Sequence, residues 1–318
     1  MGTLVGHVAP GFGFLIIGLW HLFNHTKLHL QNPKTYISSP WFPTSKLKYL
    51  ELFLIMVATI SSISMELFIG PDRHQPFDPD GTIPSNHLHN FEHASISMTF
   101  FVYAVFAIIL DKLETKSKSS LTQLLASIAF FQQFLLFHLH SSDHMGPEGQ
   151  YHLLLQALIF VSFSTTLFGI SMQKSFLVSF VRSLSIFFQG LWLMIMGFML
   201  WTPSLISKGC FMNLEEGHRV VRCSDDESLH RAIALVNIMF SWFLILVTIF
   251  GVSFYLICTK FFDENKVRYF TLGNIEEEGE EFEKFNDDVE NQKGSLVGNQ
   301  KSFIHVGKKT FSPVDIER

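Results

Sequence analysis

The residues best suited to chemistry in this sequence are histidines, several of which are grouped with carboxylates at helical spacing. Residues 138–152 contain four histidines and two carboxylates. His140 and His144 are four residues apart, as are His89 and His93, and this spacing places both side chains on one face of a helix. Imidazole and carboxylate groups together suit transition metals such as zinc. The pattern predicts a transition-metal site, with zinc as the favoured ion, or a proton relay.

The composition indicates that membrane helices position these residues. The chain has 318 residues, of which 48% are hydrophobic and only 16% are charged, whereas soluble domains carry roughly a quarter charged residues. Crossing the hydrocarbon core of a bilayer takes about 20 apolar residues in a helix. Seven stretches qualify, at about residues 3–23, 48–69, 88–110, 121–141, 151–172, 176–200 and 230–259. We therefore expect an all-α integral membrane protein built as a bundle of seven transmembrane helices.

The distribution of basic residues predicts the orientation of this bundle. The first, third and fifth connections carry nine Lys and Arg residues, whereas the other three carry five that are offset by ten acids. Because basic residues concentrate in cytoplasmic loops, we expect a lumenal or extracellular N-terminus and a cytoplasmic C-terminus. Residues 1–261 would form the transmembrane domain, and residues 262–318 an acidic, mostly disordered cytoplasmic tail.

With this orientation, eleven of the 15 histidines fall on the lumenal or external side. Glu66 and Glu92 lie at the same depth, and ionisable groups within a bilayer commonly mark a functional site. We expect these residues to converge in a cavity between helix ends. The candidate metal ligands are His7, His89, His93, His138, His140, His144 and His152. Glu66, Glu92 and Asp143 are candidates for further ligands or for hydrogen-bond partners of the ligating histidines.

The remaining polar and small residues of the spans receive structural interpretations. His21, His25 and His29 also recur every four residues, but Lys27 beside them favours an exposed helix surface. Amide side chains within the spans are expected to hydrogen-bond between helices; they are Gln132, Gln133, Gln156, Gln189 and Asn237. Glycines that would let helices approach closely are Gly11, Gly13, Gly18, Gly190 and Gly197.

The three cysteines predict one disulfide and one candidate lipidation site. Cys210 and Cys223 lie in the sixth connection, which the expected orientation places in an oxidising compartment, so a disulfide is favoured over two free thiols. Cys258 lies near the cytoplasmic end of the last span and is a candidate for palmitoylation. The sequon that begins at Asn24 would face the cytoplasm and stay unglycosylated.

Several short segments resemble the transmembrane protein 45 family, in particular its plant viral-response-type branch. They are Gly6-His7, Pro10-Gly11, Gly18-Leu19-Trp20, Glu92-His93 and the run FHLHSSDHMGPEGQYHLLLQ at residues 137–156. The resemblance extends over about residues 1–260 and leaves out the tail. It implies a seven-span protein of the Golgi, another endomembrane or the plasma membrane, and supplies no mechanism.

Three classes of function follow from these features. The first is a membrane protein without established enzymatic activity whose lumenal-side His/Glu cluster binds a transition metal or relays protons. The second is an intramembrane metal-dependent lipid hydrolase, in which bound water is activated by the metal. The third is a non-enzymatic pH sensor or trafficking adaptor, whose tail binds cytoplasmic partners. Haem held by paired histidines is less favoured. The lipid bilayer is the expected partner in every class, and a net charge of −5 argues against nucleic acid.

Overall fold

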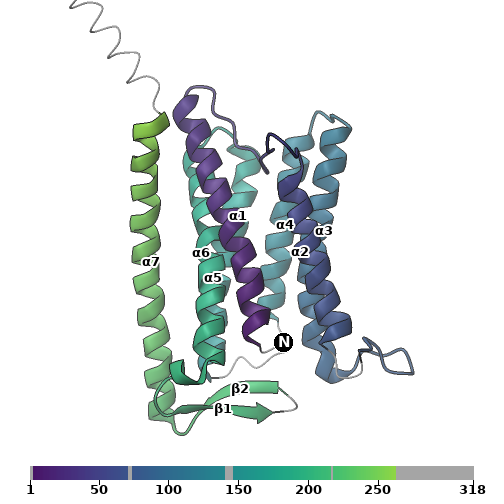
Figure 1. Ribbon diagram of the computed structural model, residues 1–318, viewed down its shortest axis with the longest axis vertical. Helices are drawn as coiled ribbons and strands as arrows, with labels where there is room; N and C mark the ends of the chain where they lie inside the picture. The colour runs from purple at the N-terminus through teal and green to yellow at the C-terminus, as the bar shows by residue number, and fades with distance from the viewer. Residues whose placement is uncertain (1–2, 71–73, 140–145, 216–217, 263–318) are drawn as a thin grey trace, which may run out of the picture. The chain divides into compact units, whose positions relative to one another are not determined.

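The computed structural model describes residues 3–70, 74–139, 146–215 and 218–262 (Figure 1). The chain divides into two units, Met1–Asp263 and Glu264–Arg318. The second unit lies outside the described residues, so the interpretation of the tail stays a prediction. Within the described part of the first unit, seven helices are long and apolar enough to cross a membrane.

These helices are joined by short turns and one hairpin. Their bounds are α1 (Leu4–Gln31), α2 (Leu50–Ser64) with its π-helical extension η1 (Met65–Ile69), η2 (Ser85–His87), α3 (Leu88–Lys112), α4 (Lys118–His138), α5 (Gly146–Ser171), α6 (Phe176–Trp201), η3 (Pro203–Leu205), β1 (Cys210–Glu215), β2 (His218–Cys223) and α7 (Asp226–Phe262). The predicted spans agree with these helices except at the end of α1. The hairpin β1–β2 was not part of the all-α expectation.

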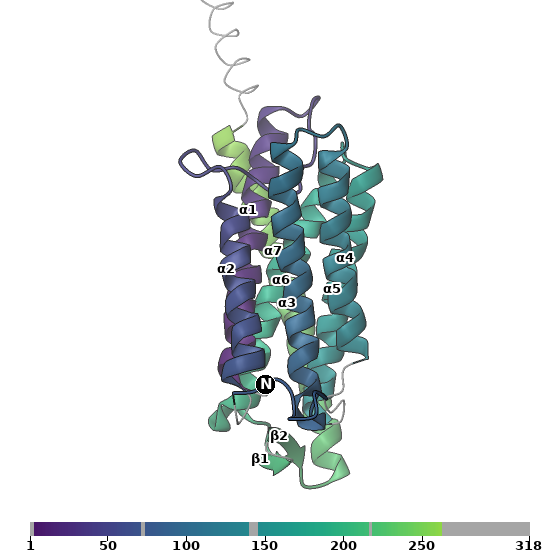
Figure 2. The ribbon, with the colours of Figure 1, turned by 90° about the vertical axis from the view of Figure 1, so that its right-hand side faces the viewer.

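Helices α1 to α6 form an open ring. Neighbouring helices pack along their lengths in the order α1, α6, α5, α4, α3 and α2, whereas α2 touches α1 only weakly. Figures 1 and 2 show the pairs α2–α3 and α4–α5 side by side, with α7 packed outside α5, α1 and α6. The ring is thus closed between five pairs of helices and open between α1 and α2.

Glycines bring α1 and α6 into close antiparallel contact. A Cβ atom added to Gly190 would collide with the backbone nitrogen of Leu15, and one added to Gly18 would collide with the backbone of Phe187. Gly11 and Gly197 also contact the opposite helix closely, as expected. Gly13 is different, because a Cβ there would meet nothing within 4 Å. The prediction of close approach is therefore wrong for Gly13, which faces a cavity.

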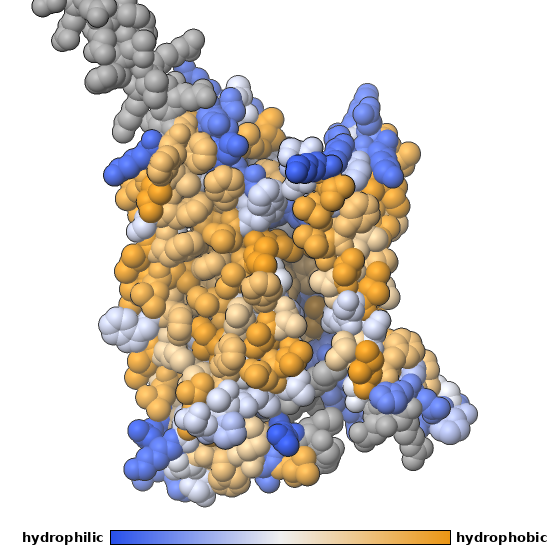
Figure 3. All heavy atoms as spheres, in the orientation of Figure 1, coloured by the Kyte–Doolittle hydropathy of each residue, from blue (hydrophilic) through white to orange (hydrophobic). Residues whose placement is uncertain are grey.

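Buried amides join different helices of the ring, as the sequence suggested. Gln189 on α6 donates to the side-chain oxygen of Gln133 on α4 over 3.0 Å. Gln156 on α5 donates to the Phe137 carbonyl of α4 over 2.7 Å. Figure 3 shows hydrophobic residues covering the middle of the visible helical surface, with hydrophilic residues toward both ends. This distribution is typical of helices that face lipid.

Candidate functional site

A cavity of about 1550 Å³ lies inside the open ring. It is lined by residues from all six ring helices and from the hairpin. On α1 the lining includes both His7 and His21, which are fourteen residues apart in the sequence, or about 21 Å along a helix. Polar side chains gather at its two ends. The hairpin-end cluster consists of His7, Glu66, Asn90, His93 and His152. The loop-end cluster, beneath the α1–α2 connection, consists of His21, His25, Tyr36, Glu51 and Arg182.

Glu66 is the buried acid of the hairpin-end cluster. It lies on η1, where α2 widens into a π-helical turn, a feature often found at functional sites. Its Oε2 accepts a hydrogen bond from Asn90 Nδ2 over 2.8 Å, and its Oε1 lies 3.3 Å from His93 Nδ1. Asn90 and His93 are three residues apart on α3 and therefore share a helix face. The result is a carboxylate–imidazole pair beside the cavity.

His7 on α1 and His152 on α5 complete this cluster, with ring centroids 6.0 Å apart. Their Nδ1 atoms lie 3.0 and 3.1 Å from the backbone carbonyls of Thr3 and Glu148, respectively. Such a bond places the imidazole proton on Nδ1 and a lone pair on Nε2. The ring of His7 also stacks on Trp201 at 4.4 Å, which fixes its orientation.

The structure brings together only part of the predicted metal site. His7, Glu66, His89, His93 and His152 line the cavity. By contrast, His138 is exposed at the end of α4, and the half-buried Glu92 is not among the lining residues. His140, Asp143 and His144 lie outside the described residues. Among the residues that are described, no group of three or more His, Cys, Asp or Glu side chains is arranged to hold a metal ion.

Glu51 anchors the loop-end cluster from the start of α2. Its Oε1 lies 2.7 Å from His21 Nε2. Its Oε2 accepts hydrogen bonds from Trp20 Nε1 over 3.0 Å and from the backbone nitrogen of Phe42 over 2.9 Å. Three donors from α1 and from the α1–α2 connection thus satisfy this buried carboxylate, and they join α1 to α2 at this end of the cavity.

Arg182 on α6 is the buried cation of the loop-end cluster and is only 3% exposed. Its Nη2 donates to His25 Nε2 over 2.8 Å and to the Ser39 carbonyl over 3.1 Å. Because His25 accepts through Nε2, its Nδ1 carries the proton that it donates to the Tyr36 hydroxyl over 2.9 Å. Burial holds the pKa of the Tyr36 phenol above its ordinary value, so this group stays neutral at physiological pH.

The loop-end cluster corrects the sequence interpretation. His21 is 5% exposed and His25 is fully buried, so the prediction of an exposed helix surface is wrong for both. The helix α1 extends to Gln31 because these two side chains pack inside the bundle. Arg182 is one of the nine basic residues counted above for the first, third and fifth connections, but it lies inside α6. The spacing of His21 and His25 was the signal for a buried face, and Lys27 beside them obscured it.

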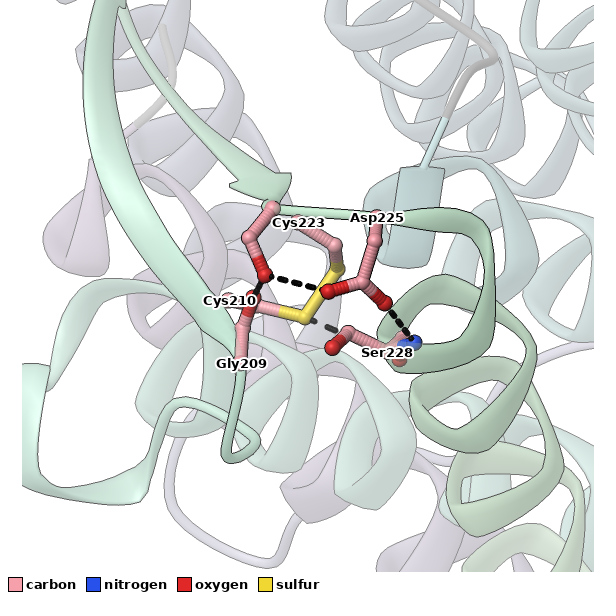
Figure 4. The surroundings of a disulfide bond; sticks show 6 residues. Gly209, Cys210, Cys223, Asp225 and Ser228 are labelled. Atoms are coloured by element: carbon pink, nitrogen blue, oxygen red, sulfur yellow. Dashed lines mark hydrogen bonds between the residues drawn. A yellow bond between two sulfur atoms is a disulfide. The ribbon is translucent and has the colours of Figure 1, made fainter.

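The hairpin is tied to the start of α7 at the other end of the cavity (Figure 4). Cys210 and Cys223 are joined by a disulfide, and Asp225 accepts from the backbone nitrogen of Ser228 over 2.8 Å. Glu215 and Arg222 of the hairpin form an ion pair and line the cavity. Cys258 on α7 is a free, buried thiol, and its palmitoylation stays a prediction.

These features define a multi-pass helical protein of the membrane type with one large, polar-ended cavity. Residues 119–256, which extend from α4 into α7, match a family of unknown function, DUF716. The transmembrane protein 45 type belongs to that family, so the match supports the resemblance seen in the sequence at the family level. The plant viral-response-type branch stays a prediction.

Proposed function

We propose that the hairpin-end cluster relays protons within the cavity of a non-enzymatic membrane protein. The observation that carries this proposal is the pairing of Glu66 with His93 beside His7 and His152. An imidazole can accept a proton at one ring nitrogen and release one from the other, as a relay requires. A buried carboxylate next to it provides a second protonation site, and cavity water could connect this pair to His7 and His152.

Proton flux in reconstituted vesicles tests this proposal. The full-length protein is placed in liposomes that contain a pH-sensitive dye, and a pH gradient is imposed. We expect flux above that of empty liposomes, and a decrease of at least about tenfold for Glu66→Gln, because the amide cannot exchange a proton. Glu92→Gln is the matched control, since Glu92 lies at a similar depth outside the cavity lining. Wild-type flux equal to that of empty liposomes, or undiminished flux in Glu66→Gln, would contradict a relay.

Metal binding at the same cluster is the second candidate. It is favoured by the Nδ1–carbonyl contacts of His7 and His152, since ligating histidines usually donate their second nitrogen in this way. Elemental analysis of the purified wild-type protein should then find stoichiometric zinc or another transition metal. The double variant His7→Ala/His152→Ala should lose it, whereas the exposed His230→Ala should not. Wild-type protein without stoichiometric metal would exclude this candidate.

We also propose that the hairpin end faces the lumen or the cell exterior, in the Golgi, another endomembrane or the plasma membrane. The excess of Lys and Arg in the connections at the opposite end supports this orientation. A glycosylation sequon inserted after Asp80 should be modified in cells, whereas one inserted after Thr115 should not. The reverse pattern would invert the orientation and place the proton relay on the cytoplasmic side.

A further inference from the structure

The cavity opens sideways between α1 and α2. Several residues at this gap, which we call the rim, are both exposed at the surface and part of the cavity lining; they are Val5, Ala9 and Pro10 on α1, Ala58 and Ser61 on α2, and Met65 on η1. Figure 3, in the orientation of Figure 1, shows a hollow between the left and right parts of the visible surface. Because these residues lie within helices that are long and apolar enough to cross a membrane, the opening would face the hydrocarbon of the bilayer.

The cavity between the two clusters has an apolar wall. It is formed by side chains that include Phe14, Ile17, Ile55, Phe100 and Phe130. Hydrocarbon is favoured over water in such surroundings. Trp20 and His21 bind Glu51 and close the gap between α1 and α2 at the loop end. A molecule that enters from the bilayer would therefore pass between α1 and α2 at the rim and then extend along this apolar wall toward Arg182.

Arg182 provides a buried positive charge at the end of that path, and it has no ion-pair partner among the described residues. Its guanidinium lines the cavity, and among the described residues no carboxylate lies within 4 Å of it and no hydrogen bond reaches its Nε or Nη1. Both oxygens of Glu51 are occupied by other donors. Glu51 attracts Arg182 through space without forming an ion pair with it, so the site favours an anion that pairs directly with the guanidinium. Guanidinium groups bind carboxylate and phosphate oxygens in particular.

Polar neighbours for such a group line the cavity together with Arg182. They include Gln123 and Thr166. Gly169 lets Gln123 and Arg182 pack closely against α5, since a Cβ atom there would lie 2.6 Å from Gln123 Nε2 and 3.5 Å from Arg182 Nη1. The hydrogen bonds from Nη2 hold the guanidinium in one orientation.

We propose that the cavity binds an anionic amphiphile with one acyl-type chain, whose carboxylate or phosphate pairs with Arg182 while its chain extends toward the lateral opening. The length is consistent with a long chain. His25, which contacts Arg182, and Ala9 at the rim are sixteen residues apart on α1, or about 24 Å, compared with about 30 Å for the hydrocarbon core of a bilayer. This site is separate from the hairpin-end cluster and does not depend on the proton relay.

Binding of radiolabelled palmitate to the purified full-length protein in mild detergent tests the proposal. We expect saturable binding that weakens by at least about tenfold in Arg182→Gln, because a charge-assisted pair is lost. Hexadecanol, which has the chain without the charge, should compete poorly, and inorganic phosphate, which has the charge without the chain, should not compete. Equal affinity of the wild type and Arg182→Gln would overturn the proposal. So would equal competition by hexadecanol, or displacement by phosphate, which would indicate a site for free anions.

A second pair of variants tests lateral access without altering Arg182. Ala58→Trp places a large side chain at the rim, and Val57→Trp places the same side chain on the adjacent, exposed position that does not line the cavity. We expect palmitate association to slow in Ala58→Trp and to stay at the wild-type rate in Val57→Trp. Equal rates in both variants would overturn the lateral route, even if Arg182→Gln failed to fold.

Discussion

The two ends of the cavity each contain a histidine–glutamate pair, yet the pairs differ in how firmly they are held. At the loop end, the His21–Glu51 distance is 2.7 Å and both side chains are at most 6% exposed. At the hairpin end, His93 lies 3.3 Å from Glu66 and is 25% exposed. Besides its histidine, Glu51 accepts hydrogen bonds from two further donors, whereas Glu66 accepts one, from Asn90.

This difference suggests different roles for chemically similar groups. A carboxylate that accepts three hydrogen bonds has its charge fixed and its position defined, which suits a rigid frame around Arg182. A pair that is longer and partly exposed can exchange protons with water in the cavity. The contrast separates the two proposals physically, with a binding site at one end and a titrating site at the other.

We expect the largest effect from a substitution where α1 crosses α6, because this crossing supports the fold at both ends of the cavity. Gly190→Ala should prevent stable folding, because the added methyl group collides with the backbone of Leu15 and a packed backbone cannot relax as a side chain can. Gly13→Ala is the matched control and should be neutral or stabilising by about 0.5–1 kcal/mol, since it removes backbone entropy in a helix where space is open. Thermal unfolding of both variants in detergent measures the difference. Equal melting of the two would show that the crossing is not closely packed.

A pair of isosteric substitutions should separate the two acids. Glu51→Gln should destabilise the protein by about 2 kcal/mol. The substitution replaces one carboxylate oxygen by an NH2 group, which cannot accept a hydrogen bond, so at least one of the three donors around Glu51 is left without an acceptor. Glu66→Gln should cost less than about 1 kcal/mol, because its oxygen can still accept from Asn90 while its amide can donate to the ring nitrogen of His93. The free energies of unfolding from thermal melts provide the comparison. A larger loss for Glu66→Gln would reverse the assignment of the rigid and the responsive ends.

The sequence predicted the spans well, because apolar runs of the required length leave little choice of structure in a bilayer. It also pointed to Glu66, His7, His93 and His152, since residues near one set of helix ends are neighbours in any compact bundle. It could not locate the loop-end cluster. The burial of His21 and His25 depends on the fold of the α1–α2 connection and on Arg182 of α6, which is more than 150 residues away in the sequence. Such partners are selected by tertiary packing and leave no local pattern.

The smallest effect is expected at the hairpin, where Glu215 contacts Arg222 through Nε at 2.8 Å and through Nη2. Arg222 holds the pKa of the Glu215 carboxyl below its ordinary value. The ion pair therefore stabilises the folded protein at pH values above the ordinary pKa of Glu215. This stabilisation is lost as the pH falls through the lowered pKa of Glu215 in the folded protein. Protease resistance of the hairpin should be slightly lower in Glu215→Gln than in the wild type at neutral pH, and equal to it in strong acid. The double variant Glu215→Gln/Arg222→Gln should lose no more than Arg222→Gln alone, because the loss of Arg222 already removes this interaction. If the difference in protease resistance between the wild type and Glu215→Gln persists in acid, Glu215 supports the hairpin by packing rather than by its charge. The contrast between the two ends of the cavity would then depend on Glu66 and His93 alone.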